Sequence, residues 1–244
     1  MEFLNDITVM TIIQVGFWLF AAVASLYFSI GNARVWTSIS TGFFLIFFSQ
    51  AYLLNPYAMY HKLAAIHYII STIAIIVLTF GFREYFFFAR TLEIGGSKRM
   101  VYLITVLAVA ASAAFILVNP KPEDTVLRNI KMIDNTNWVF LSLVNILMIR
   151  KIYVQIKDSP ISRGFIAFGF VFFCIFLWKG SALYLQVYQW DNEWRDIVSF
   201  LGGTTDAANY PARIGFSLTV NRIMAIASPL SVGGTFLYLL KLLR

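Results

Sequence analysis

The chain has 244 residues, of which 59% are hydrophobic and 13% are charged, and its formal net charge is +7. A soluble domain carries about 25% charged residues, so this composition excludes an ordinary water-soluble protein. The basic residues lie in short segments between apolar runs rather than in a contiguous stripe, which argues against a nucleic-acid partner. We therefore expect an all-α, polytopic transmembrane helix bundle that forms a single domain over residues 1–244.

About seven apolar runs approach or exceed the roughly 20 residues that a helix needs to cross a bilayer. The fifth run is the shortest, because Arg150 and Lys151 end it. The last is long enough to need a tilt or a kink, for which Pro229 offers a site. In chain order the expected spans are Thr8–Ile30, Val35–Leu54, Leu63–Phe82, Met100–Val118, Trp138–Val154, Gly164–Tyr188 and Ile214–Leu240.

Charge is sorted between the connecting segments. On one side of the expected bundle, which includes the segments Arg83–Arg99 and Arg150–Arg163, cations outnumber acids by eleven to three. On the other side, which includes the expected loops Asn119–Asn137 and Gln189–Arg213, acids outnumber cations by nine to six. Because Lys and Arg are retained on the cytoplasmic side, the N-terminus should lie outside and the C-terminus in the cytoplasm. We expect the cytoplasmic (inner) membrane of a bacterium or archaeon.

Two cations fall inside expected spans, Lys179 in the sixth and Arg222 in the seventh, at similar depth below the outer surface. A charge at mid-bilayer costs at least about 2.5 kcal/mol, so each needs a partner, water or a ligand. All carboxylates, Asp134 included, are expected in loops or at helix ends. The cations therefore favour an anionic or electron-rich guest such as a lipid headgroup, a carboxylate metabolite or a quinone. In a purely structural alternative, Lys179 snorkels outward and Arg222 pairs with Asp206.

Uncharged polar residues fall in the same outer half of the expected bundle, whereas the inner half is more uniformly apolar. We expect them to form, with the two cations, a water-accessible pocket open to the outside. The candidate ligand-binding residues are Lys179, Arg222, His67, Asn145, Gln50 and Gln14.

The sequence contains little that points to catalysis or metal binding. His61 and His67, the two histidines, lie near one end of one expected helix, turned roughly 240° apart around its axis, so they do not converge on a haem. Two histidines cannot form a three-histidine zinc site, and the lone Cys174 cannot form a disulfide within the chain. We expect no catalytic residue, no metal and no cofactor.

These observations predict a non-catalytic integral membrane subunit of a larger membrane-associated assembly, with a lipid or quinone in the outer polar pocket. Its expected partners are membrane lipids and other membrane or periplasmic subunits. One alternative is a small anion channel or carrier that uses Lys179 and Arg222. Another is a ligand sensor that signals through a partner docked on the cytoplasmic segments.

Overall fold

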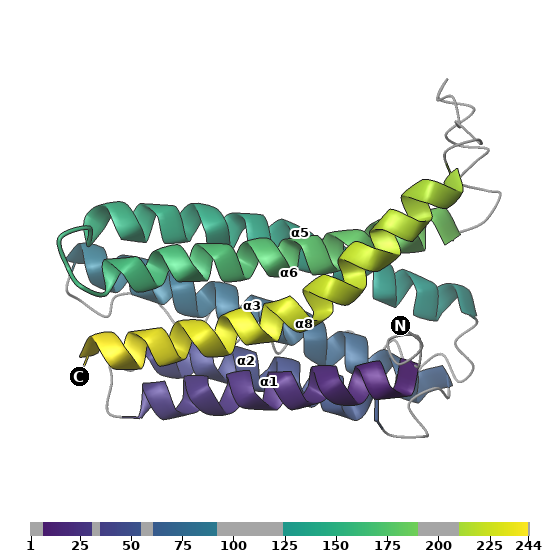
Figure 1. Ribbon diagram of the computed structural model, residues 1–244, viewed down its shortest axis with the longest axis horizontal. Coiled ribbons are helices and arrows are strands. Elements are labelled where there is room, and N and C mark those ends of the chain that lie inside the picture. Colours follow the sequence, from purple (N-terminus) through teal and green to yellow (C-terminus); the bar gives the residue numbers. More distant parts are fainter. Residues whose placement is uncertain (1–6, 31–34, 55–60, 92–123, 190–209, 244) are drawn as a thin grey trace.

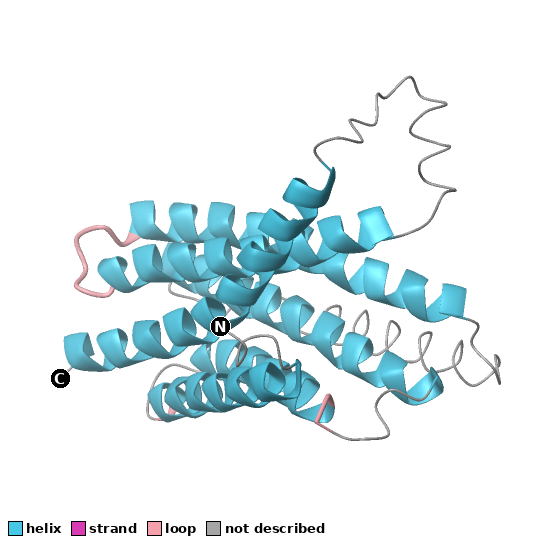
Figure 2. Ribbon diagram, turned by 45° about the vertical axis from the view of Figure 1, so that its right-hand side comes forward, coloured by secondary structure: helices cyan, strands magenta, loops and turns pink. Residues whose placement is uncertain are grey.

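The computed structural model describes residues 7–30, 35–54, 61–91, 124–189 and 210–243, and these are helical apart from short turns (Figures 1 and 2). No strand occurs among them. The helices are α1 (Ile7–Ser29), α2 (Val35–Tyr52), α3 (His61–Thr91), α5 (Asp124–Gln155), α6 (Ser162–Gln189) and α8 (Tyr210–Leu243).

Five of these helices, α1, α3, α5, α6 and α8, are long and apolar enough to cross a membrane, which indicates an integral membrane protein. The remaining helix, α2, has 18 residues, and its serines, threonines and Gln50 lower its mean hydropathy. The expected fourth span, Met100–Val118, lies outside the described residues. Seven crossings and the orientation of the termini therefore stay predictions.

The largest difference from the expected spans is at the start of α5. Asn119–Asn137 was predicted to be a polar loop, but α5 begins at Asp124 and continues without a break to Gln155. In the sequence, Pro122 and Asp124 form a helix start signal. The expectation was wrong because the first turns of this helix carry many polar residues, which depress the hydropathy on which it relied.

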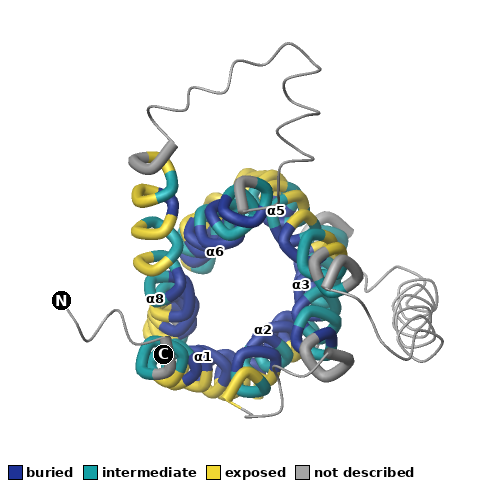
Figure 3. The backbone as a smooth tube through the Cα atoms, turned by 90° about the vertical axis from the view of Figure 1, so that its right-hand side faces the viewer, coloured by how far each residue is buried: buried dark blue, intermediate teal, exposed yellow. Residues whose placement is uncertain are grey.

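The six described helices form a ring in chain order. Each packs against the next along the chain, and α8 closes the ring by packing against α1. Figure 3 shows the buried residues facing the inside of the ring and the exposed residues facing outward. The pairs α1–α2, α2–α3, α5–α6 and α6–α8 run in opposite directions, whereas α3 and α5 run in the same direction, since Thr72 contacts Asp134 and Thr79 contacts Asn145. Residues late in α2 and α6 therefore lie at the same end of the ring as residues early in α3, α5 and α8.

Aromatic side chains fill the end of the ring that holds the start of α2 and the end of α8. The Trp36 ring lies 4.8 Å from that of Phe28, and the Phe168 ring lies 5.3 Å from that of Phe236. Phe82 and Phe172 are 5.2 Å apart between centroids. Most of these pairs are edge-on or tilted, as aromatic rings prefer. This end of the ring therefore has a tightly packed apolar core.

Two glycines allow α2 and α3 to approach closely, as small residues do between membrane helices. A Cβ atom added at Gly81 would lie 2.7 Å from Ile39 Cγ1 and 3.0 Å from the Ile39 backbone nitrogen. One added at Gly42 would lie 2.5 Å from Leu78 Cγ. The close α2–α3 contact positions Ser49 of α2 against His67 of α3.

Replacing Gly81 by alanine should destabilise the protein, because the added methyl group meets backbone as well as side-chain atoms of Ile39. We expect a loss of about 1–3 kcal/mol, typical of overpacking, seen as a lower unfolding midpoint in detergent micelles. Gly16→Ala is the matched control, since a Cβ there meets nothing within 4 Å. Equal midpoints for Gly81→Ala and the wild type would contradict the close packing.

Candidate functional site

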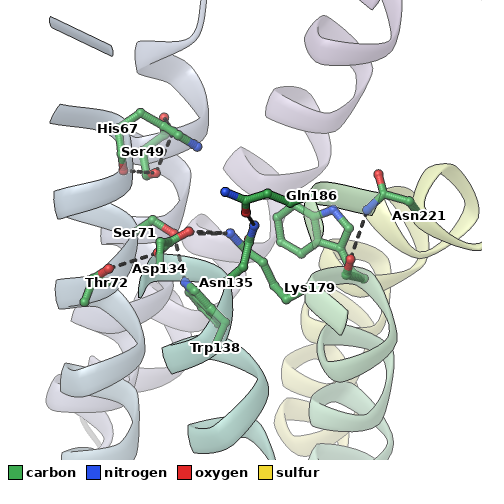
Figure 4. A network of polar contacts seen from close by, with 11 residues as sticks. Ser49, His67, Ser71, Thr72, Asp134, Asn135, Trp138, Lys179, Gln186 and Asn221 are labelled. Carbon is green, nitrogen blue, oxygen red and sulfur yellow. Dashed lines mark hydrogen bonds and ion pairs between the residues drawn. The ribbon is translucent and has the colours of Figure 1, made fainter. Parts of the chain in front are cut away.

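A buried ion pair lies at the end of the ring opposite the aromatic core. The Nζ atom of Lys179 on α6 is 3.0 Å from Oδ2 of Asp134 on α5, and the two side chains are only 6% and 0% exposed (Figure 4). This corrects the expectation that every carboxylate lies in a loop or at a helix end, because Asp134 lies well inside α5. The negative charge of Asp134 therefore compensates the positive charge of Lys179 inside the bundle.

The spacing of polar residues along α5 explains how Asp134 reaches the interior. Asp134, Trp138, Ser142 and Asn145 recur at helical spacing and are all buried, so they share the inward face of the helix. The side chains of Ile133 and Phe140, on the other side of α5, are exposed. Polar and apolar residues are thus arranged on α5 with the polar face turned inward.

Further contacts complete the surroundings of both charges. Thr72 Oγ1 donates to Asp134 Oδ1 at 3.0 Å, and Lys179 Nζ lies 3.4 Å from Ser71 Oγ. Ser71 Oγ also accepts a hydrogen bond from Trp138 Nε1 at 2.8 Å. The ammonium group lies 5.4 Å from the Trp138 ring centroid and 5.0 Å from that of Trp178, within range of cation–π attraction. The pair consequently links α3, α5 and α6.

Amide side chains extend this polar layer toward α8. Asn135 Nδ2 on α5 donates to Gln186 Oε1 on α6 at 3.0 Å. Asn221 Nδ2 on α8 lies 2.9 Å from the Trp178 carbonyl oxygen and 3.2 Å from Ser181 Oγ, both on α6. Hydrogen bonds between side chains thus connect α5 to α6, while Asn221 joins α6 to α8.

His67, a predicted site residue, connects α3 to α2. Its Nδ1 atom is 2.7 Å from the Ser49 carbonyl oxygen, and because a carbonyl only accepts, Nδ1 carries the proton in this contact. Ser49 Oγ donates in turn to the His67 carbonyl oxygen at 3.0 Å. His67 lies one turn before Ser71 on α3, so it belongs to the same polar layer as the ion pair (Figure 4).

The other predicted site residues differ in how far they are buried and in whether they contact the polar layer. Asn145 is buried on α5 and its Nδ2 donates to Thr79 Oγ1 of α3 at 3.1 Å. Gln50 is buried on α2, whereas Gln14 is partly exposed on α1. Arg222 is exposed on α8 and does not join Lys179, whose charged group turns toward α3 and α5.

Sequence reasoning missed most of the partners of Lys179. The signal for Asp134 was present in the helical spacing of Asp134, Trp138, Ser142 and Asn145, which matches one face of a helix longer than the expected span. The missed residues that contact Lys179 are Asp134, Ser71 and Trp138. Also missed were Thr72, which bonds to Asp134, and the hydrogen-bonded pair Asn135 and Gln186.

The fold and the site define a helical membrane protein with a buried lysine–aspartate pair in its interior. Within the described helices, no group of three or more His, Cys, Asp or Glu side chains lies close enough together to hold a metal ion. No protein-family model, curated protein or solved structure matches the chain.

Lys179→Met should destabilise the protein more than the combined change Lys179→Met/Asp134→Leu. The single change leaves the Asp134 carboxylate buried without its cation, a loss of about 3–5 kcal/mol, whereas replacing both partners by apolar groups is often neutral or stabilising. Unfolding midpoints of the wild type, both single variants and the double variant in one detergent would measure this. A double variant no more stable than the weaker single variant would contradict the direct pairing.

Proposed function

We propose that the protein is a non-catalytic integral membrane subunit of a larger membrane-associated assembly. In this proposal the helix ring is a fixed framework that binds membrane lipid and neighbouring subunits at its outer surface. The observation that carries the proposal is the internal charge match between Lys179 and Asp134.

An ionisable side chain inside a membrane marks a functional site by default, because its burial must be compensated. Here the compensation comes from the chain itself: Asp134 accepts from both Lys179 and Thr72, and Ser71 and two indole rings surround the ammonium group. A site satisfied in this way needs no anionic guest. Buried pairs of this kind can select one helix register over others, which is the role that we propose for it.

The outer face of α5 supports contact with another membrane protein. Ile133, Phe140, Leu147 and Val154 recur at every seventh residue, and each is more than half exposed. A seven-residue repeat keeps apolar side chains along one seam of a helix, which suits packing against a second helix. We propose that a helix of a neighbouring subunit packs along this seam of α5.

Purification from native membranes in a mild detergent would test this role. We expect the wild-type chain to co-purify with other membrane proteins. The double variant Phe140→Ala/Leu147→Ala should no longer bind these proteins, because the two changes remove the large apolar side chains at the centre of the seam. Phe170→Ala/Phe173→Ala is the matched control, since both side chains are exposed on α6. The unfolding midpoints of both double variants should stay close to that of the wild type. Recovery of the wild-type protein alone, without co-purifying proteins, would refute the subunit role.

A small carrier is the second candidate, favoured by polar atoms that continue inward from the ion pair. Ser142 Oγ and Asn145 Oδ1 are buried and have no hydrogen-bond partner within the described part of the chain. Both lie on the same face of α5 as Asp134. In this candidate function the Ser142 hydroxyl donates to an anion that displaces the carboxylate from Lys179, whereas Asn145 Oδ1 is an acceptor and does not contact the anion. Anion flux into liposomes that rises in Asp134→Asn would support the carrier, and flux equal to that of empty liposomes would support the subunit.

A further inference from the structure

A cleft of about 720 Å³ lies between α6 and α8, within the roughly 300–1,000 Å³ typical of ligand pockets. The first turns of α8 stand away from the rest of the ring, as Figures 1 and 3 show. Pro229 lies inside α8, where a proline removes a backbone hydrogen bond and favours a bend. The walls of the cleft are mainly apolar and include Phe176, Leu177, Tyr184, Phe216 and Val220.

The floor of the cleft is held by hydrogen bonds between the two helices. Ser217 Oγ of α8 donates to the Ser181 carbonyl oxygen of α6 at 3.2 Å, and both serines are buried. Asn221 adds its bonds to Trp178 and Ser181 one turn further along α8. The cleft is thus separate from the buried ion pair, because Lys179 turns toward α5 and does not line it.

The cleft is short, and this decides what can occupy it. Its lining residues extend over roughly two turns of each helix, from Phe176 to Tyr184 on α6 and from Arg213 to Val220 on α8. At the other end of the same seam, Gly164 of α6 packs directly against the side chain of Leu239 of α8. A transmembrane helix takes about 20 residues to cross the bilayer, whereas this groove follows only about two turns of each wall, which suits a shorter occupant.

Arg213 supplies the charge at one end of the cleft. It is exposed and begins the apolar span Arg213–Leu242, which places it where lipid headgroups meet the hydrocarbon region. Phe216, one turn further into the span, is 73% exposed, and Val220 follows after another turn. A cation at the boundary with an apolar groove below it complements an anionic headgroup attached to an acyl chain.

We infer that the α6–α8 cleft binds an anionic phospholipid. Its phosphate lies against the Arg213 guanidinium group, and one acyl chain lies along Phe216, Val220 and Leu177. This site gives the lipid binding of the proposed function a location and a headgroup charge, and to that extent rests on it.

Native mass spectrometry of the purified chain, reconstituted with equal amounts of phosphatidylglycerol and phosphatidylcholine, tests the site. The wild type should retain phosphatidylglycerol selectively, and Arg213→Gln should lower that retention about tenfold, as expected for one lost charge-assisted contact. Val220→Phe should also lower retention, because the larger ring fills the cleft while Arg213 remains. Lys241→Gln, which removes an exposed cation near the opposite end of α8, is the matched control and should retain the lipid as the wild type does.

Equal retention of phosphatidylglycerol by the wild type and Arg213→Gln would overturn the inference. A loss of phosphatidylglycerol in Lys241→Gln as large as that in Arg213→Gln would also overturn it. A photoreactive benzophenone side chain in place of Phe216, activated in native membranes, distinguishes the occupants. An adduct of lipid mass supports the inference, whereas an adduct with a protein overturns it. Because retention is measured on the chain alone, its failure would leave the co-purification result standing, and a missing partner would leave the lipid preference unchanged.

Discussion

The burial of Lys179 in the interior of a membrane bundle carries a large free-energy cost. On lenient insertion scales the cost for one charge at the bilayer centre is about 2.5 kcal/mol. The structure meets this cost with a carboxylate 3.0 Å away, two aromatic faces and the hydroxyl of Ser71. These groups come from α3, α5 and α6, so the pair can form only when the three helices adopt one relative register.

That requirement accounts for the division of the ring into two ends. At one end, buried serines, amides, His67 and the ion pair bond to one another between neighbouring helices. At the other, close-packed rings around Trp36 and Phe168 fill the interior. Directional hydrogen bonds select the helix register, and aromatic packing contributes burial and dispersion. The external features, the α5 seam and the α6–α8 cleft, lie on the surface of this framework.

Hydropathy and run length predicted the helices whose faces are mostly apolar. The expected spans near α1, α6 and α8 agree with the structure to within a few residues at each end. The same reasoning failed at α5, because Asp134 and Asn135 lower the hydropathy of a helix that buries them against partners. A hydropathy sum treats every polar residue as facing lipid or water. It contains no information on which polar side chains pair with each other between helices, as Asp134 does with Lys179.

The sequence predicted the burial of Lys179 in the candidate site but not the partner of Lys179. The depth of Lys179 along its helix follows from counting residues, and the structure does bury it. Its partner depends on the rotation and register of α5 against α6, which are properties of packing rather than of either segment. Arg222 has a similar depth, but the rotation of α8 leaves it exposed, so depth alone grouped two residues that do not meet.

Disulfide cross-linking would test the α5–α6 register most directly. A Cβ atom at Gly180, the neighbour of Lys179, would lie 3.9 Å from Val139 Cγ2, the side chain next to Trp138. In a Cys174→Ser background, Val139→Cys/Gly180→Cys should cross-link rapidly in membranes under mild oxidation, whereas Val139→Cys/Tyr184→Cys, displaced by one turn, should not. Efficient cross-linking of only the displaced pair would place Asp134 away from Lys179 and contradict the account.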